Sequence, residues 1–202
     1  MYLFGGTHSA EETEISFSGA AKDFILTAEP DATTVKKTVS AVSGDAVFST
    51  EAKSLSVSKI DFILSTESGK VLTVPLFFVT VGSFSLTDVT IASDDEDNGI
   101  PLTKPALKMG GTFTATITKC SFEGLSLPSG RGSAIYAEMN GDASLSITGS
   151  RQAGKKTFSK CSSESNGGAV YVSTGARGVF TVDAISFEEC TVASGTGAVV
   201  YM

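Results

Sequence analysis

The chain has 202 residues and a formal net charge of −7, and 41% of its residues are hydrophobic, which is enough to build a buried core. The acidic balance argues against nucleic acid as a partner. No apolar run reaches the length of about 18 residues that a membrane-spanning helix needs, so no membrane insertion is predicted. Ser and Thr make up 51 residues and Gly 21, against 5 Pro and no Trp, a composition that favours short strands joined by turns.

Residues 1–43 are predicted to form either an N-terminal cap or one or two degenerate coils, and the sequence leaves both interpretations open. Residues 1–6 lack the charged and apolar regions of a signal peptide. Ser9 and Glu12 have the spacing of a capping box, which indicates a short helical turn. Three short strands are expected in the same segment: Ile15–Phe17, Phe24–Leu26 and Val35–Val42.

A repeat with two alternating phases runs over residues 44–202, and this region is predicted to be one β-helical domain. One phase has the form G-G-A-V-Y at residues 167–171, with copies at 132–136 and 197–201. In the other phase apolar residues alternate with period two, as in a half-buried strand. Five copies of this second phase start 29, 29, 32 and 35 residues apart: at Leu55, Phe84, Phe113, Leu145 and Phe180.

The repeat length favours a solenoid, because a period near 30 residues holds two or three short strands. Leucine-rich repeats need an L-x-x-L-x-L-x-x-N motif that the sequence lacks, and β-propeller blades need about 40–45 residues. The predicted fold is therefore all-β, a right-handed single-stranded parallel β-helix of about five to six coils. Successive coils would stack at about 4.8 Å, so that equivalent residues lie above one another.

Three tyrosines share one position of the repeat. Tyr136, Tyr171 and Tyr201 are expected to stack on one another as a column at inward positions. Gly167 and Gly168 are expected to supply positive φ where the chain turns a corner.

The three cysteines are assigned to a single further column of the core. Cys120, Cys161 and Cys190 are interpreted as reduced structural thiols, because stacked parallel thiols with similarly directed Cβ atoms suit packing better than a disulfide.

The pairing of F-x-x-C at Phe158–Cys161 with G-G-A-V-Y at Gly167–Tyr171 resembles the repeats of right-handed parallel β-helix proteins of the pectate-lyase-like superfamily. It is particularly similar to chlamydial polymorphic outer-membrane proteins and to β-helix surface proteins of protists. The resemblance covers residues 44–202 and is sharpest from residue 113. It implies the fold and an extracellular or cell-surface location, in a group that includes adhesins, autotransporter passenger domains and polysaccharide lyases.

The densest acidic cluster is a candidate metal site. Asp94, Glu96 and Asn98 have the spacing of the first three ligands of an EF-hand loop, and Gly99 falls at its glycine position. Pro105 stands where the bidentate Glu is required, and no flanking helices are predicted. A solvated acidic loop is the favoured interpretation and a weak surface calcium site is the alternative. Calcium is the one cofactor that the sequence suggests.

Two further motifs are interpreted as structural. Gly149–Thr157 nearly matches a phosphate-binding P-loop, but Lys156 stands where the magnesium-binding hydroxyl belongs, so a long polar loop is predicted. His8 is the only histidine, and any Ser-His-Asp or Cys-His site would have to use it. A surface position is the favoured interpretation for His8.

The favoured function is a non-enzymatic structural or interaction module, part of a larger cell-surface or adhesin-like protein that presents a surface to a protein or glycan ligand. Because the chain stops at Met202 directly after a repeat strand, end-to-end contact with further coils or another chain is expected. The alternative is a polysaccharide-binding enzyme or a lyase or glycosidase, and a glycosidase needs two carboxylates about 5–9.5 Å apart. Four carboxylates are available, without an aligned pair: Asp142, Asp183, Glu188 and Glu189.

Overall fold

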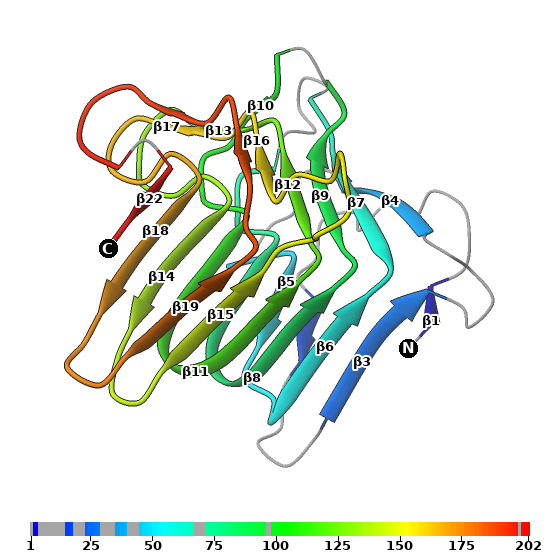
Figure 1. Cartoon of the computed structure of the whole chain (residues 1–202). Coiled ribbons are helices and arrows are strands. Elements are labelled where there is room, and N and C mark those ends of the chain that lie inside the picture. The colour runs from blue at the N-terminus through cyan, green and yellow to red at the C-terminus, as the bar shows by residue number, and fades with distance from the viewer. Residues whose placement is uncertain are drawn as a thin grey trace.

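The computed structural model describes eight segments of the chain: residues 2–3, 15–17, 23–28, 35–39, 45–66, 72–95, 98–197 and 199–202. Within these segments every element is a strand, and the strands form three parallel sheets. The sheets are stacked as a β-solenoid of about five turns (Figure 1). The predicted all-β parallel β-helix is thereby confirmed.

The three sheets are named A, B and C here. Sheet A contains β1 (Tyr2–Leu3), β2 (Ile15–Phe17), β3 (Asp23–Ala28), β5 (Phe48–Thr50), β6 (Ser54–Ser58), β8 (Phe77–Thr87), β11 (Leu107–Thr118), β14 (Ile135–Met139), β15 (Ser144–Thr148), β18 (Val170–Thr174), β19 (Val179–Asp183) and β22 (Val200–Tyr201). Sheet B contains β4 (Val35–Val39), β7 (Ile60–Leu64), β9 (Thr90–Ser93), β12 (Ser121–Glu123), β16 (Phe158–Ser159) and β20 (Phe187–Glu188). Sheet C contains β10 (Ile100–Pro101), β13 (Leu125–Leu127), β17 (Ser162–Ser163) and β21 (Thr191–Val192).

Each complete coil passes through sheet A, then sheet B, then sheet C, and then returns to sheet A. The coil of β11, β12 and β13 shows this order along the chain (Figure 1). β11 crosses sheet A as one long strand, and in the next coil β14 and β15 pair with its two halves. Short loops therefore leave the stack sideways without disturbing the pairing between coils.

The core consists of inward columns of equivalent residues. In sheet B the rings of Phe122, Phe158 and Phe187 stack with centroids 5.2 Å apart and interplanar angles of 13° and 12°. Phe122 and Phe158 are fully buried. Burying one such side chain contributes about 1.5–3 kcal/mol to stability, so a column of like rings stabilises each added coil.

Outward columns carry hydroxyl groups, which explains the high content of Ser and Thr. The Ser85 Oγ donates to the Ser56 Oγ at 2.9 Å, and the Ser162 Oγ donates to the Ser126 Oγ at 3.0 Å. Both bonds join neighbouring coils, because register pairs these residues directly. Neighbouring coils are thus joined by contacts on the outer surface as well as by contacts in the core.

The predicted repeat start at Phe113 is wrong by two residues. Phe84 pairs with Ala115, because the register of β11 against β8 shifts between Met109 and Thr112. Gly111 lies in this bulge with φ +104, and a Cβ there would meet the Thr80 carbonyl oxygen at 2.5 Å. Phe113 and Ala115 both face inwards, so a period-two pattern cannot distinguish the two alignments.

The tyrosine column forms as predicted, but its inward orientation was wrong. Tyr136, Tyr171 and Tyr201 are in register, with ring centroids 5.1 and 5.4 Å apart and interplanar angles of 13° and 3°. Ile135 and Ala137, on either side of Tyr136, are fully buried. Alternation along a strand therefore places the tyrosine column on the outer face of sheet A. The rings lose exposure by covering one another rather than by entering the core.

The prediction that the three cysteines form a single column is also wrong. Cys120 precedes β12 and stacks with Val89, whereas Cys161 and Cys190 follow β16 and β20 and stack with Leu125. The three thiols thus occupy two different corners of the coil. All three are free thiols, as expected.

The strands expected in residues 1–43 are observed as β2, β3 and β4. These strands pair in parallel with β5, β6 and β7 of the following coil. The helical turn expected at Ser9–Glu12 lies outside the described residues.

Glycine is required where the chain enters sheet A. Gly132, Gly167 and Gly197 have φ values of +61, +72 and +66, which L side chains rarely adopt. A Cβ on Gly167 would also lie 2.2 Å from the Val170 carbonyl oxygen. The expected positive φ is thus found at Gly167, while Gly168 keeps an ordinary negative φ.

Two substitutions, Gly167→Ala and Gly154→Ala, should separate the cost of this clash from the cost of backbone strain. Gly167→Ala introduces both, and Gly154→Ala introduces backbone strain alone. Gly154 has a similar φ of +78, but a Cβ there would meet nothing within 4 Å. We expect Gly154→Ala to cost about 1–2 kcal/mol and Gly167→Ala to cost about 1–3 kcal/mol more, as measured by urea unfolding. Equal losses would show that the corner relaxes around the added methyl group.

Candidate functional site

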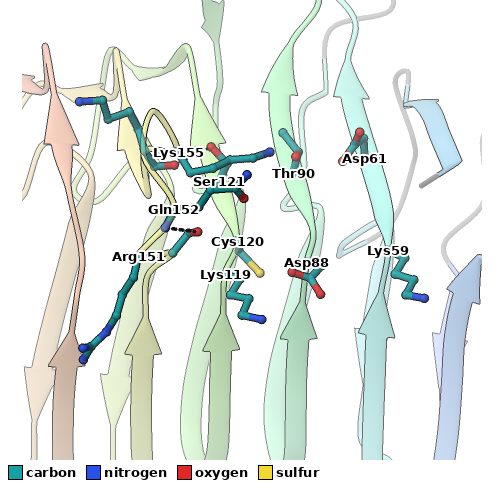
Figure 2. Close-up of a pocket in the computed structure, with 12 residues that line it drawn as sticks. Lys59, Asp61, Asp88, Thr90, Lys119, Cys120, Ser121, Arg151, Gln152 and Lys155 are labelled. Carbon is teal, nitrogen blue, oxygen red and sulfur yellow. Dashed lines mark hydrogen bonds between the residues drawn. The ribbon is translucent and has the colours of Figure 1, made fainter. Parts of the chain in front are cut away.

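A polar cavity lies over the outer face of sheet B, where the chain turns from sheet A into β7, β9 and β12 (Figure 2). Its volume is about 540 Å³. A neighbouring cavity of about 350 Å³ shares Asp61 and Thr90 with it. The two form one depression, called here the sheet B groove, and residues 150–152 and 155–156 of the long polar loop line one side of it.

The corner beside the groove carries a row of charged side chains. Lys59, Asp88 and Lys119 occupy equivalent positions in successive coils, with φ values of +57, +52 and +55. Their backbone N–H groups donate to carbonyl oxygens of the next coil at 2.8–3.1 Å. A left-handed conformation costs a non-glycine residue about 1–2 kcal/mol, which these hydrogen bonds offset. Asp88 lies between the two lysines (Figure 2).

The long polar loop adds cations to the groove, two of which are already paired. Arg151 turns away from the groove and donates to Asp183 at 3.1 Å (Figure 2), and the Lys156 ammonium lies 3.9 Å from Glu188. The other charged side chains of the larger cavity form no ion pair within the described part of the chain: Lys59, Asp61, Asp88, Lys119 and Lys155. Cations therefore outnumber carboxylates in the groove, which suits a polar or anionic ligand.

Cys120 is the one thiol in the wall of the larger cavity. It is 3% exposed, and its Sγ lies 3.4 Å from the Thr118 carbonyl oxygen. Burial raises the pKa of this thiol to about 12, so it stays protonated and unreactive at neutral pH. His8 lies outside the described residues. The groove does hold one hydroxyl paired with a carboxylate, because the Ser121 Oγ donates to the Glu123 Oε1 at 2.5 Å.

Cys190 is the most accessible of the three thiols. It is half-buried, and its hydrogen bond with the fully buried Cys161 is the main cause that lowers its pKa to about 7. Burial raises the pKa of Cys161 in the same pair. A thiol with a pKa near neutrality is partly ionised at physiological pH, and the thiolate is the nucleophilic form.

The candidate calcium ligands do not converge in the described residues. The Asp94 Oδ1 accepts hydrogen bonds from the Thr66 N–H at 2.8 Å and the Thr66 hydroxyl at 2.5 Å, and so joins two coils. The Asn98 side chain donates to Asp95 at 3.1 Å within a turn. Glu96 lies outside the described residues, and no metal-binding group of three His, Cys, Asp or Glu residues occurs among the others. A calcium site at this loop stays a prediction.

Three of the four carboxylates considered for catalysis are engaged on the surface. Asp183 and Glu188 pair with the loop cations named above, and Asp142 pairs with Arg177 at 3.0 Å. Glu189 sits at a corner with φ +52. The structure instead brings Asp61 and Asp88 to the groove, two residues that sequence reasoning missed.

A signal for the corner row was present in the sequence. Lys59, Asp88 and Lys119 each follow a Ser or Thr and precede an apolar residue, which is the first residue of β7 or lies directly before β9 and β12. Aligning the copies on this S/T-charged-apolar triplet would have identified the row and also corrected the start at Phe113.

Comparison with known proteins yields no relative: no family model, no curated protein and no solved structure matches the chain. Among the described residues, no helix is long and apolar enough to span a membrane.

Alkylation should distinguish the three cysteines. In the folded protein iodoacetamide should modify Cys190 first, with a rate that rises with pH to a midpoint of about 7, because deprotonation creates the nucleophile. Peptide mass spectrometry measures the site and rate. Cys190→Ser should abolish the fast phase and Cys120→Ser should leave it unchanged. Modification of Cys120 at a comparable rate would contradict the assignment.

Proposed function

We propose that the chain is a non-enzymatic structural and interaction module, whose rigid outer faces present side chains to a ligand. One observation carries this proposal: charged side chains on the outer surface join neighbouring coils. Lys53 with Asp23, Arg177 with Asp142 and the two loop pairs described above all connect residues 30 to 35 positions apart. Exposed pairs of this kind add little to stability because solvent screens them, so their main effect is to position the charged side chains on the surface.

The module is further proposed to be part of a larger extracellular or cell-surface protein of adhesin type. The support is the solenoid itself together with the sequence resemblance of the F-x-x-C and G-G-A-V-Y units to pectate-lyase-like β-helix proteins, in particular polymorphic outer-membrane proteins. An extended rod with variable loops can present several faces along its axis. No nucleic acid partner is proposed, because the net charge is −7.

A polysaccharide-binding or polysaccharide-cleaving enzyme is the second candidate. The observation that favours it is the sheet B groove, where Asp61 and Asp88 from neighbouring coils lie beside Lys59 and Lys119. Two carboxylates with nearby cations could act on a sugar, provided that the carboxylates are correctly spaced.

An activity assay separates the two functions. We expect the chain to release no more reducing ends or unsaturated sugar from neutral, acidic and sulfated polysaccharides than the double variant Asp61→Asn, Asp88→Asn. General acid–base catalysis contributes about 100-fold or more, so a wild-type rate exceeding the double variant by that factor would establish the enzyme. The same polysaccharides on an array measure binding without turnover.

End-to-end association is the contact proposed for the edge formed by β19, β20, β21 and β22. Within the described residues each of these strands pairs on one side only. Val182 belongs to an inward column with Ile147, yet it is 48% exposed at this edge. A further coil, from the same or another chain, would cover such apolar groups and pair the free backbone.

Sedimentation tests this contact with two matched variants. The mean mass of the wild-type chain should rise with concentration, and Val182→Lys should abolish the rise because it places a charge on the stacking edge. Val179 is 53% exposed but faces outwards in register with Ser144, so Val179→Lys should leave association unchanged. A monomer at every concentration, or equal effects of both substitutions, would contradict the contact. Circular dichroism checks that both variants fold.

A further inference from the structure

A second cavity lies on the outer face of sheet A, beside the tyrosine column. It has a volume of about 300 Å³ and is bounded by β14 and by the loops that lead from sheet C back into sheet A. Two successive coils contribute its charged groups, which comprise three cations and one carboxylate: Lys104, Lys108, Arg131 and Glu138. A net positive cavity on a chain with a net charge of −7 is a local reversal of charge.

Among the residues that the structure describes, the cations of this cavity form no ion pair with a carboxylate. The chain has three arginines, and Arg151 and Arg177 form ion pairs at 3.1 and 3.0 Å. Arg131 forms none among the described residues. Its Nη1 donates to the Tyr171 hydroxyl at 3.1 Å and its guanidinium lies 5.1 Å from the centre of that ring. The remaining N–H groups of the guanidinium fork are left for a ligand.

The one carboxylate of the cavity is already engaged, because Glu138 accepts a hydrogen bond from the Tyr136 hydroxyl. Lys108 is held in place by an aromatic ring, with its Nζ 5.0 Å from the centre of Phe78. Lys104 is exposed and makes no ion pair within the described chain. All three cations can therefore act on a group that enters the cavity.

Arg131, whose guanidinium is held by its contacts with Tyr171, lies between two glycines with positive φ. Gly130 and Gly132 have φ values of +144 and +61, and a Cβ on Gly132 would lie 2.2 Å from the Ile135 carbonyl oxygen. These two glycines hold the chain in a conformation that other residues would strain. A cation whose position is fixed before binding loses less entropy when it binds.

We propose that this cavity binds a carboxylate side chain of an acidic peptide segment, with Arg131 as the principal contact and Lys104 and Lys108 as supporting cations. The guanidinium fork matches a carboxylate, and Tyr and Arg are the residue types that dominate protein interfaces. The proposal rests on the proposed function of the chain as an interaction module, for which it names the partner chemistry.

The stacking of the tyrosine column favours a peptide over a sugar. A pyranose packs its C–H groups on the face of an aromatic ring, but the faces of Tyr136 and Tyr171 cover each other at 5.1 Å with an angle of 13°. Tyr171, which also stacks on Tyr201 at 5.4 Å, therefore presents only its edge and hydroxyl group to solvent, and the second face of Tyr136 is directed at the coil of Lys108, with which Tyr136 is in register. Edges and hydroxyls suit hydrogen bonds to a peptide backbone and its side chains.

Nuclear magnetic resonance of the arginine side chains tests the proposal directly. A ¹⁵N-labelled chain should give three Nε–H resonances, and Arg131→Gln assigns one of them. Titration with a capped hexaglutamate peptide at low salt should shift the Arg131 resonance in a saturable way. The resonances of Arg151 and Arg177 should stay in place and act as internal controls. Added salt should weaken the binding, because the cations are exposed.

Variants then measure each contact. Arg131→Gln should weaken hexaglutamate binding by about tenfold or more, as measured by the saturable shift of the Tyr136 backbone resonance. Arg131→Lys should recover only part of the affinity, because it keeps the charge but loses the planar fork. Arg177→Gln, which removes a paired arginine elsewhere, should leave the affinity unchanged.

Three outcomes would overturn the proposal. They are equal shifts of all three arginines, no shift at millimolar peptide, or saturable binding of a glucuronate oligomer with none of hexaglutamate. The last result would assign the cavity to a glycan. Turnover of a polysaccharide, by contrast, would refute the proposed function without moving the Arg131 resonance.

Discussion

The in-register parallel pairing of successive coils is the constraint on which the rest of the structure depends. It sets a spacing of about 4.8 Å between equivalent residues, which is close to the separation of 5.2 Å observed between the centroids of Phe158 and Phe187. The same repeat distance aligns hydroxyl groups, ion pairs and tyrosine rings on the outer surface. Core and surface are therefore specified by one geometric rule, and a substitution in one coil acts on its two neighbours.

Sequence patterns predicted the parallel β-helix, the tyrosine column and the positive φ at Gly167, because each depends on the identity of residues one period apart. The errors share a cause. A period-two pattern looks the same when it is shifted by two residues. Phe113 was therefore aligned with Phe84, whereas the true partner of Phe84 is Ala115, which faces the same way. Tyr136 was expected at an inward position, although the adjacent Ile135 is the buried residue of that strand.

The candidate site was harder to predict because its groups come from corners rather than strands. Lys59 and Asp88 carry opposite charges, so the row is visible in the sequence only when the copies are aligned on the S/T-charged-apolar triplet, and both residues have the left-handed backbone of a corner. Arg131 gave no signal by residue type either. Its distinction from Arg151 and Arg177 is the missing carboxylate partner, which is a property of the folded surface and cannot be derived from spacing in the sequence.

The outer tyrosine column concentrates the fluorescent side chains of the protein in its C-terminal coils. The chain has four tyrosines and no tryptophan, and three of the four lie in one column across the coils of β14, β18 and β22. Solenoids can unfold in stages, because each coil contacts only its neighbours. Tyrosine fluorescence will therefore report chiefly the C-terminal coils, whereas far-ultraviolet circular dichroism averages over every strand. A difference between the two signals during unfolding would locate the end of the solenoid that opens first.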